Sequence, residues 1–394
     1  MKSIRNFLDN VKPSFEKGKR LYFLHSTFEA FESLLFVPKT VTTGGCHVRD
    51  AIDLKRTMTV VIAALTPALL FGIWNVGFQR YLSVSHEVGF WSIFGYGLGK
   101  ILPMLAVSYI VGLGIEFAVA QVRGHEVNEG FLASGILIPM IMPPDLPLWM
   151  LALATAFAVI IGKEVFGGTG MNIFNPALLA RAFVFFSYPS HMSGDSIWIG
   201  GLSGSTAVVD GFSGATPLAK AFAGQLPFSA MEVENMFWGF IPGSVGETST
   251  AAILLGAALL VFTGVGSGRI MLSVAAGGFL TGLLFNRIGA NAYMNIPAYQ
   301  HLVMGGFAFG AVFMATDPVT SSQTGVGKWI YGFLIGAVAI IIRVLNPAYP
   351  EGMMLAILLM NAFAPLIDHC VVQAHIRRRL NRAKQIVQQG YKPK

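Results

Sequence analysis

Ten apolar stretches recur along this chain, and most approach the length that a helix needs to cross a lipid bilayer, which is about 20 residues. Of the 394 residues, 54% are hydrophobic and only 12% are charged. A soluble domain carries about 25% charged residues. The sequence therefore predicts an all-α polytopic membrane protein with about ten transmembrane helices. The stretches lie near 57–79, 93–121, 130–143, 148–162, 176–188, 249–265, 270–286, 301–316, 329–344 and 353–370.

Polar intervals divide the chain into five parts. Residues 1–55 mix aromatic with charged side chains, which predicts amphipathic helices at the membrane surface. These helices are either a simple anchor or the wall of a pocket for a flat hydrophobic ligand. Residues 56–188 and 248–371 are two membrane parts with five stretches each. The interval 189–247 is polar and acidic, and residues 372–394 are a basic cytoplasmic tail.

The basic residues predict the orientation of the chain. Of the 27 Lys and Arg residues, 21 lie before the first stretch, in the tail, or in loops on the same side as both. Basic residues collect on the cytoplasmic side of a membrane protein. Both termini are therefore expected in the cytoplasm, with 189–247 outside. Topology and anionic lipid explain the net charge of +7, so no nucleic-acid partner is expected.

A repeat relates the two membrane parts. Asp145 precedes the Asn-Pro-Ala step at 175–177 by 30 residues, and Asp317 precedes that at 346–348 by 29. Five stretches separate equivalent points, and an odd number inverts the second copy. We therefore expect two inverted five-helix repeats with short or broken helices at a central site. The stretches 130–143 and 301–316 are short enough to be half-helices.

Three carboxylates lie at or near membrane depth, where ionisable groups are costly and indicate function. Glu116 lies inside the second stretch, and its only obvious partner is Lys100, about four turns away. Asp317 follows a short helix, and Asp368 lies at the cytoplasmic end of the last stretch. Carboxylate oxygens suit a hard cation. Helix-end turn formation for Asp317 and solvation for Asp368 are the alternatives.

Two asparagines, Asn172 and Asn175, lie one turn apart where the fifth stretch begins. Asparagine caps helices readily. The two amides could instead bond a polar ring system near the cytoplasmic surface, because residues three apart on a helix share a face. No nicotinamide-binding fingerprint, phosphate-binding loop or cysteine pair stands out, so no NADH site is expected on this chain.

The string Asp-Gly-Phe-Ser-Gly-Ala-Thr at 210–216 lies in the external interval. Its polar side chains and two glycines are typical of a turn. The string also resembles D-x-x-[S/T]-G-A-T, the signal read by periplasmic flavin transferases, which attach FMN to the final threonine through a phosphodiester bond. That resemblance implies covalent FMN on Thr216. The recognition positions are Asp210, Ser213, Gly214 and Ala215.

A wider similarity runs from the N-terminal part to the last stretch. In these strings of residues, given at the end of this paragraph, the chain resembles the B subunits of the Na⁺-translocating NADH:quinone reductases of bacterial inner membranes. The resemblance implies a urea-transporter-like fold and the other subunits A, C, D, E and F as partners. The strings are His47–Asp50, Asp53–Arg56, Gly124–Gly130, Lys163–Pro176, the 210–216 motif, Ile241–Ser244 and Asn346–Gly352.

The same resemblance implies a route for electrons. They would pass from a neighbouring subunit's FMN to the FMN on Thr216, then to a non-covalent riboflavin, and finally to a quinone, with Na⁺ exported. Membrane lipid and a flavin transferase are further implied partners. The matching positions are Asn172, Asn175 and Asp317 for riboflavin, Gly112 and Glu29 for quinone, and Glu116 and Asp368 for the Na⁺ pathway.

Two other interpretations remain open. One is the D subunit of the related ferredoxin-linked electron-transport (Rnf) complex, which carries a similar flavinylation motif. The long N-terminal part, with its His-Val-Arg-Asp sequence at 47–50, favours the sodium-pump subunit. The other is a urea-transporter-like channel without a redox role, since fold alone does not define function. A channel has no use for a flavinylation signal, so Thr216 discriminates between the channel and a flavin-carrying subunit.

Overall fold

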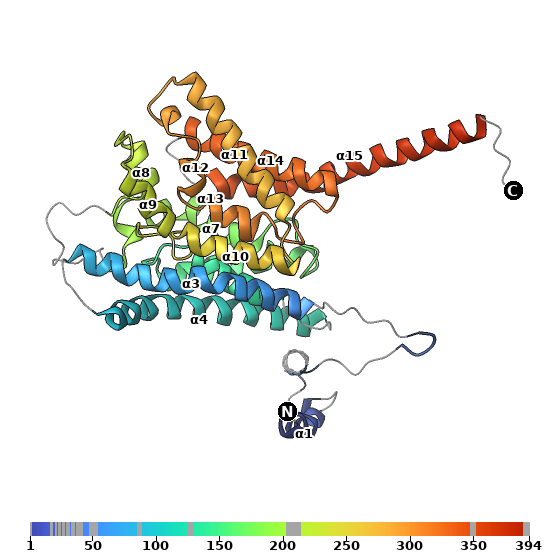
Figure 1. Cartoon of the computed structure of the whole chain (residues 1–394). Helices are drawn as coiled ribbons and strands as arrows, with labels where there is room; N and C mark the ends of the chain where they lie inside the picture. Colours follow the sequence, from blue (N-terminus) through green and yellow to red (C-terminus); the bar gives the residue numbers. More distant parts are fainter. Residues whose placement is uncertain are drawn as a thin grey trace.

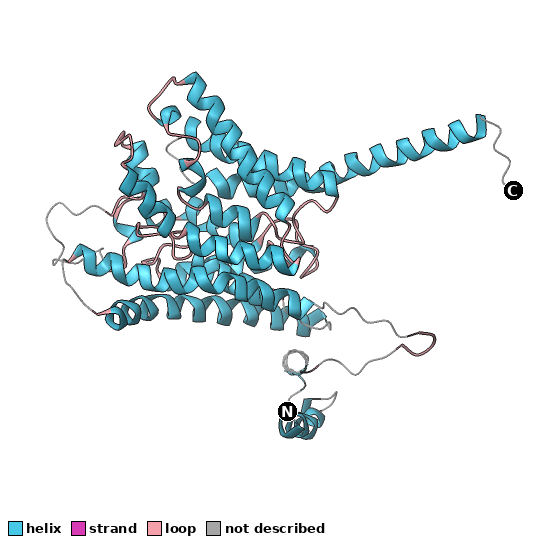
Figure 2. Ribbon diagram, in the orientation of Figure 1, coloured by secondary structure: helices cyan, strands magenta, loops and turns pink. Residues whose placement is uncertain are grey.

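The computed structural model describes residues 2–15, a few residues between 19 and 46, and the ranges 54–84, 89–123, 130–201, 214–346 and 352–388. Within these residues the chain is helical and contains no strand (Figures 1 and 2). The predicted positions Glu29, Asp210 and Ser213 lie outside the described residues. The rest of the predicted site residues can be placed.

Among the described residues, six helical segments are long and apolar enough to cross a membrane, as the predicted polytopic class requires. They correspond to α3 (Leu54–Ser83), α4 (Phe90–Arg123), α6 (Leu148–Ile160) with the short turn that follows it, α11 (Gly268–Ile288), α14 (Gly325–Leu345) and α15 (Gly352–Gln388). Helix α15 continues without a break through the expected start of the tail at 372. Much of the predicted basic tail is therefore an extension of the last helix.

The remaining stretches do not form spanning helices, so the expected count of ten is not confirmed. Helix α10 is the longest of three short apolar helices, and its 14 residues extend about 21 Å, less than the roughly 30 Å of the hydrocarbon core. The other two are α5 (Phe131–Met140) and α7 (Pro176–Ser187), and α10 is Thr250–Thr263. The stretch 301–316 is broken into α12 (Gln300–Val303), α13 (Phe307–Phe309) and a π-helical turn, Gly310–Met314.

The helices pack in the same order in both membrane parts. Helix α4 lies against α6, and α6 against α7; in the second part α11 lies against α14, and α14 against α15. Helix α3 joins the two parts by packing on both α4 and α10. Glycines allow close approach, because a Cβ at Gly97 would lie 1.8 Å from the carbonyl oxygen of Ile73, and one at Gly336 would lie 2.0 Å from that of Val274. The inverted repeat itself stays a prediction.

The two ends of the bundle carry different elements. Helices α8 (Pro217–Phe222) and α9 (Ala230–Trp238) lie at one end, and α15 leaves the bundle at the other (Figure 1). The chain begins with α1 (Lys2–Val11) and a 3₁₀ turn, Lys12–Phe15. One link from this N-terminal part to the bundle is a hydrogen bond, 3.3 Å long, that Gln121 Nε2 near the end of α4 donates to the carbonyl oxygen of Tyr22.

Candidate functional site

Thr216 is the residue that begins helix α8. Its Oγ1 accepts a hydrogen bond of 3.2 Å from the backbone N–H of Ala219, so the hydroxyl oxygen caps the helix. Just before it, Gly214 is buried where a Cβ would lie 2.3 Å from the carbonyl oxygen of Asp195. Only glycine fits there without displacing backbone. Ala215 and Thr216 are both half-buried.

Thr216 lines a cavity that is partly open to solvent, which we call the threonine cavity. Aromatic and apolar side chains dominate its wall, with a few polar groups, which is the usual character of a pocket for a flat organic ligand. The side chains include Phe185, Met192, Trp198, Thr216, Ile241, Ser244 and Glu247. These residues fit an FMN attached at Thr216. Thr216 Oγ1 caps the helix as a hydrogen-bond acceptor. Because an esterified oxygen can still accept, attachment of FMN at this oxygen is compatible with the cap.

A buried ion pair backs the threonine cavity. Arg181 of α7 donates from Nη1 to Glu247 Oε1 at 2.9 Å and from Nη2 to Ser244 Oγ at 3.4 Å. The Arg181 and Glu247 side chains are 3% and 11% exposed. Such a pair is retained because removing one partner would leave the other charge buried and uncompensated. A second buried arginine, Arg343, lines an adjoining small cavity together with both of them.

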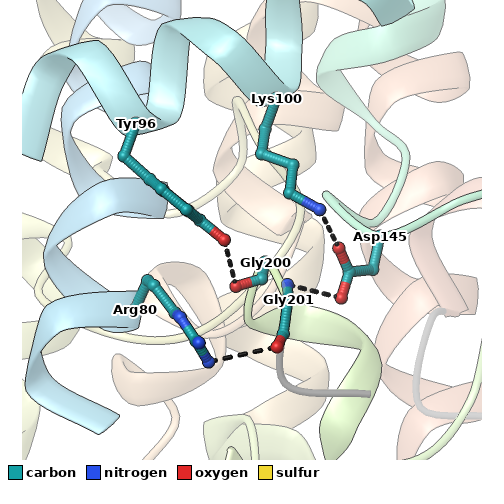
Figure 3. A network of polar contacts seen from close by, with 6 residues as sticks. All are labelled: Arg80, Tyr96, Lys100, Asp145, Gly200 and Gly201. Carbon is teal, nitrogen blue, oxygen red and sulfur yellow. Dashed lines mark hydrogen bonds and ion pairs between the residues drawn. The ribbon is translucent and has the colours of Figure 1, made fainter. Parts of the chain in front are cut away.

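The Gly200–Gly201 backbone, just before the interval that leads to the motif, is held by three side chains, one of which is paired with Lys100 (Figure 3). Tyr96 donates to the Gly200 carbonyl at 2.8 Å, and Arg80 to the Gly201 carbonyl at 3.1 Å. Asp145 accepts from the Gly201 N–H at 2.6 Å and from Lys100 Nζ at 2.9 Å. Helices α3 and α4 and the turn after α5 thereby hold Gly201, before the segment 202–213, and close packing holds Gly214 after it.

The predicted partner of Glu116 is wrong. Lys100 bonds Asp145, and Glu116 Oε1 instead accepts a hydrogen bond from Lys163 Nζ. Both side chains of this second pair are about 5% exposed or less. Lys163 follows α6, which packs on α4, so the tertiary fold brings the two charges together across 47 residues. A partner on the same helix was expected only because sequence spacing shows no others.

Asn172, Asn175 and Asp317 do meet in space. Asn175 Nδ2 donates to Asp317 Oδ2 at 3.3 Å, across 142 residues of sequence. The capping interpretation of Asn175 is confirmed, since its Oδ1 caps α7 by accepting from Ala177 N at 3.0 Å and Leu178 N at 3.3 Å, while hydrogen bonding to a ring system stays a prediction. Asn172 lies before the helix rather than on it and donates to the Phe174 carbonyl at 3.1 Å.

These three side chains line a second cavity, also partly open to solvent, which we call the amide cavity. One part of its wall is polar and the rest is apolar. The polar members are Ser134, Lys163, Thr169, Asn172, Asn175, Thr316 and Asp317, and the apolar ones include Met58, Val61, Leu137, Leu260, Val265 and Phe313. A flat ring with amide and carbonyl edges, such as riboflavin, fits this combination.

Asp317 is bonded on both oxygens. Besides Asn175, it accepts from Val319 N at 3.1 Å and from Thr320 Oγ1 at 3.0 Å. The turn alternative is therefore realised, and it does not exclude a role in the cavity. The amide and threonine cavities lie near opposite ends of α7, because Asn175 borders the first and Phe185 the second. Ten residues of helix separate them, about 15 Å.

Gly112 lies beneath an aromatic ring. A Cβ at this position would lie 1.9 Å from Cζ of Phe131, whose ring in turn lies 5.9 Å, centroid to Nζ, from Lys163. Gly112 and Glu116 are one turn apart on the buried face of α4, so the predicted quinone and Na⁺ positions on this helix are neighbours. A quinone contacting Gly112 requires that the Phe131 ring move.

Asp368 is held by the loop that begins α14. It accepts from Ser322 Oγ at 2.6 Å, Gln323 N at 2.7 Å, and both Thr324 N and Oγ1 at 3.0 and 2.6 Å. Simple solvation is therefore not its environment, although the side chain is only half-buried. Asp368 does not line the amide cavity. Among the described residues, no three His, Cys, Asp or Glu side chains group as metal ligands.

Sequence reasoning missed two parts of these sites. From the sequence, Lys163 was treated only as one of the basic loop residues that predict orientation and as the first residue of a similarity string. The pairing of Arg181 with Glu247 was not predicted. The rule that ionisable groups at membrane depth indicate function applies to Arg181 as well, so that signal was present in the sequence. Lys163 carried no such signal, because it ends an apolar stretch and its burial depends on α4.

Together, the helices define a polytopic membrane protein with two cavities near opposite ends of one short helix. A family model described as the NQR2, RnfD, RnfE family matches residues 41–377, and the chain belongs to this family. It is 47% identical to the B subunit of the Na(+)-translocating NADH-quinone reductase of Chromohalobacter salexigens, over 96% of both chains. Proteins with the same description from Stutzerimonas stutzeri and Ectopseudomonas mendocina are 46% and 47% identical, over 96% of this chain and 99% of theirs.

Proposed function

We propose that this chain is the electron-carrying membrane subunit of a Na⁺-translocating NADH:quinone reductase in a bacterial inner membrane. Thr216 carries FMN outside the membrane, the amide cavity holds riboflavin near the cytoplasmic side, and a quinone is reduced while Na⁺ is exported. The observation that carries the proposal is the pair of cavities. One contains Thr216, and the other contains all three positions matched to riboflavin.

The chain's own residues have defined tasks in this proposal. Trp198 and Phe185 border a ring tethered at Thr216, and Gly214 lets the motif pack closely before it. Asn172 and Asn175 orient a second ring by hydrogen bonds to its polar edge. When bound, the flavins supply the acceptance and release of electrons. The protein supplies position, and it encloses both rings in largely apolar walls.

The Na⁺ pathway is proposed to involve Glu116 and Asp368. In this structure Glu116 holds the ammonium of Lys163, and Asp368 holds the loop at 322–324. A Na⁺ ion binds Glu116 only in a conformation in which Lys163 has moved aside. A small bistable change of this kind is what alternating access between two repeats would require. An inverted repeat with a urea-transporter-like arrangement remains part of the proposal.

Length favours this subunit over its Rnf counterpart. The family model covers both groups and begins at residue 41, whereas the sodium-pump relatives align over 96% of the chain. Most of residues 1–40 therefore has an equivalent in those relatives. Gln121 links this N-terminal part to α4, about one and a half turns beyond Glu116, which supports a quinone site near Gly112 and Glu29. A channel without flavin remains the competing function.

The deciding experiment is co-expression with an active flavin transferase, followed by in-gel flavin fluorescence and peptide mass analysis. We expect an adduct with the mass of FMN on the peptide that contains Thr216. Thr216→Ala should abolish it, and Thr206→Ala, in the same interval but outside the motif, should keep it. Parent protein without an adduct, despite an active transferase, would overturn the proposal in favour of the channel.

A further inference from the structure

Lys163 combines burial, positive charge and a position on a cavity wall. Its side chain is 5% exposed and lines the amide cavity. Its Nζ is bonded to Glu116 and lies 5.9 Å from the centroid of the Phe131 ring. Lysine is rarely buried unless it is paired. Here a carboxylate and the face of an aromatic ring both stabilise the ammonium ion.

The cavity contains opposed charges. Among the described residues that line it, Lys163 is the cation and Asp317 the anion. Asp317 is bonded by Asn175, Val319 and Thr320, whereas the hydrogen bond that Lys163 makes is directed away from the lining set, to Glu116 on α4. Glu116 itself does not line the cavity. Lys163 is therefore the positively charged residue among the described residues that line this cavity, and its ammonium is paired with Glu116, which does not line it.

The surrounding charges keep this arrangement in place. Glu164, the next residue, is 8% exposed and lies 3.8 Å, Oε2 to Nη1, from Arg123 at the end of α4. The ring of Phe131 fills the space over Gly112, one turn from Glu116 on α4, and its centroid lies 5.9 Å from Lys163 Nζ. The low-dielectric surroundings strengthen the field of a charge at this place.

We propose that Lys163 is a cation in the wall of the amide cavity whose charge favours addition of an electron to the ring bound there, and that Glu116 acts on this cavity as the positioning residue of Lys163. The inference rests on the proposed riboflavin site. One electron, supplied by NADH through the proposed route, adds one negative charge to the ring. No bond forms or breaks at Lys163, and its proton stays on Nζ. Charge placed near a flavin ring is one of the means by which proteins tune it.

The two partners can be tested against each other, because either substitution breaks the same ion pair. Lys163→Met removes the cation near the ring, and Glu116→Gln leaves the cation without its counter-charge. The complete complex is titrated potentiometrically while the absorbance of the non-covalent flavin is followed. We expect a lower midpoint potential for Lys163→Met and a higher one for Glu116→Gln. A tenfold change in electron affinity corresponds to about 59 mV for one electron.

Opposite signs separate electrostatics from general disruption of the pair. Lys163→Arg keeps the charge and should stay close to the parent potential, and Lys328→Met removes a lysine that does not line the cavity and should have no effect. Equal shifts of both pair variants, or no shift in either, would overturn the inference. If Lys163→Met does not assemble, the sign of the Glu116→Gln shift decides alone.

Failure of the inference is distinguishable from failure of the proposed function. Flavin released from the denatured complex is identified by chromatography alongside each titration. A parent complex that releases no riboflavin would remove the proposed site, whatever the variants do. Riboflavin present at full content in Lys163→Met, with an unchanged potential, would leave the site standing and remove only the role of Lys163.

Discussion

Lys100 and Asp145 form an ion pair of 2.9 Å between α4 and the turn after α5, and the second oxygen of the same carboxylate binds the backbone N–H of Gly201. The Asp145 carboxylate thereby joins α4 and the turn after α5 to Gly201, which precedes the segment that leads to Thr216 (Figure 3). The equivalent pair near the other end of α4 is Glu116 with Lys163, which borders the amide cavity. A charged residue of α4 thus forms an ion pair near each end of the bundle.

Asp145→Asn should loosen the Gly200–Gly201 peptide, because a neutral amide accepts more weakly and cannot hold Lys100 as an ion pair. Hydrogen bonds to charged groups contribute about 1.5–3 kcal/mol, and the partial exposure of Lys100 places this loss at the low end. We expect a lower thermal unfolding midpoint in detergent and less FMN on Thr216. Asp195→Asn, an exposed acid on the same side, is the matched control. Equal values for both variants would contradict the bracing role.

Gly112→Ala should displace the Phe131 ring, since the added methyl carbon would lie 1.9 Å from Cζ. Adding a methyl group to a packed position costs about 1–3 kcal/mol. The ring also borders Lys163, so the visible spectrum of the non-covalent flavin should shift along with the unfolding midpoint. Gly114→Ala, two residues along α4 with nothing within 4 Å of its Cβ, should leave both unchanged. If Gly112→Ala changes neither the flavin spectrum nor the unfolding midpoint, the Phe131 ring moves freely.

Asp368→Asn should weaken the dependence of turnover on Na⁺ while FMN stays on Thr216. The amide keeps part of the hydrogen bonding to residues 322–324 but loses the charge that would attract a cation. Ser322→Ala removes a single hydrogen bond of 2.6 Å and keeps the carboxylate. It should lower the unfolding midpoint without changing the Na⁺ dependence. Steady-state rates over a Na⁺ series check this, and an unaltered Na⁺ dependence in Asp368→Asn would remove the residue from the pathway.

From the contacts of Glu232 we predict that the stability of α9 depends on pH, and that this effect is confined to α9. The backbone N–H of Ser229, followed by weaker contacts with Lys220 and the Ser229 hydroxyl, holds the pKa of Glu232 below its ordinary value of 4.5. A depressed folded-state pKa stabilises the helix above the unfolded pKa, and this stabilisation is lost as pH falls through the folded value. Hydrogen exchange of residues 230–238, expressed relative to the intrinsic exchange rate at each pH, should therefore accelerate below about pH 4.5, which is near the reference pKa of glutamate.

The capping box supplies the control for that measurement. Ser229 Oγ accepts from Glu232 N at 3.2 Å, and Glu232 Oε2 accepts from Ser229 N at 3.0 Å. Glu232→Gln should remove most of the acid-induced acceleration, and Glu234→Gln, two residues along the same helix, should keep it. The same acid response in all three proteins would mean that another group unfolds α9.

The sequence by itself determined the class of the protein, because apolar stretches of bilayer length with few charges have no other stable environment. It also determined which side chains were worth attention: the motif threonine, the two asparagines and the membrane carboxylates are recognisable by residue type and local context. The helix caps at Asn175 and Thr216 belong to the same level, since capping involves only residues two or three positions away.

Only the tertiary structure decided which of these residues meet. Asn175 reaches Asp317 across 142 residues, and Glu116 pairs with Lys163 rather than with Lys100 on its own helix. Helix lengths were also decided there, since breaks such as the one at Gly305, with φ of +59°, shorten stretches whose composition predicts a span. Pairing depends on how helices cross in three dimensions. The local spacing of residues along one chain carries no information about that crossing.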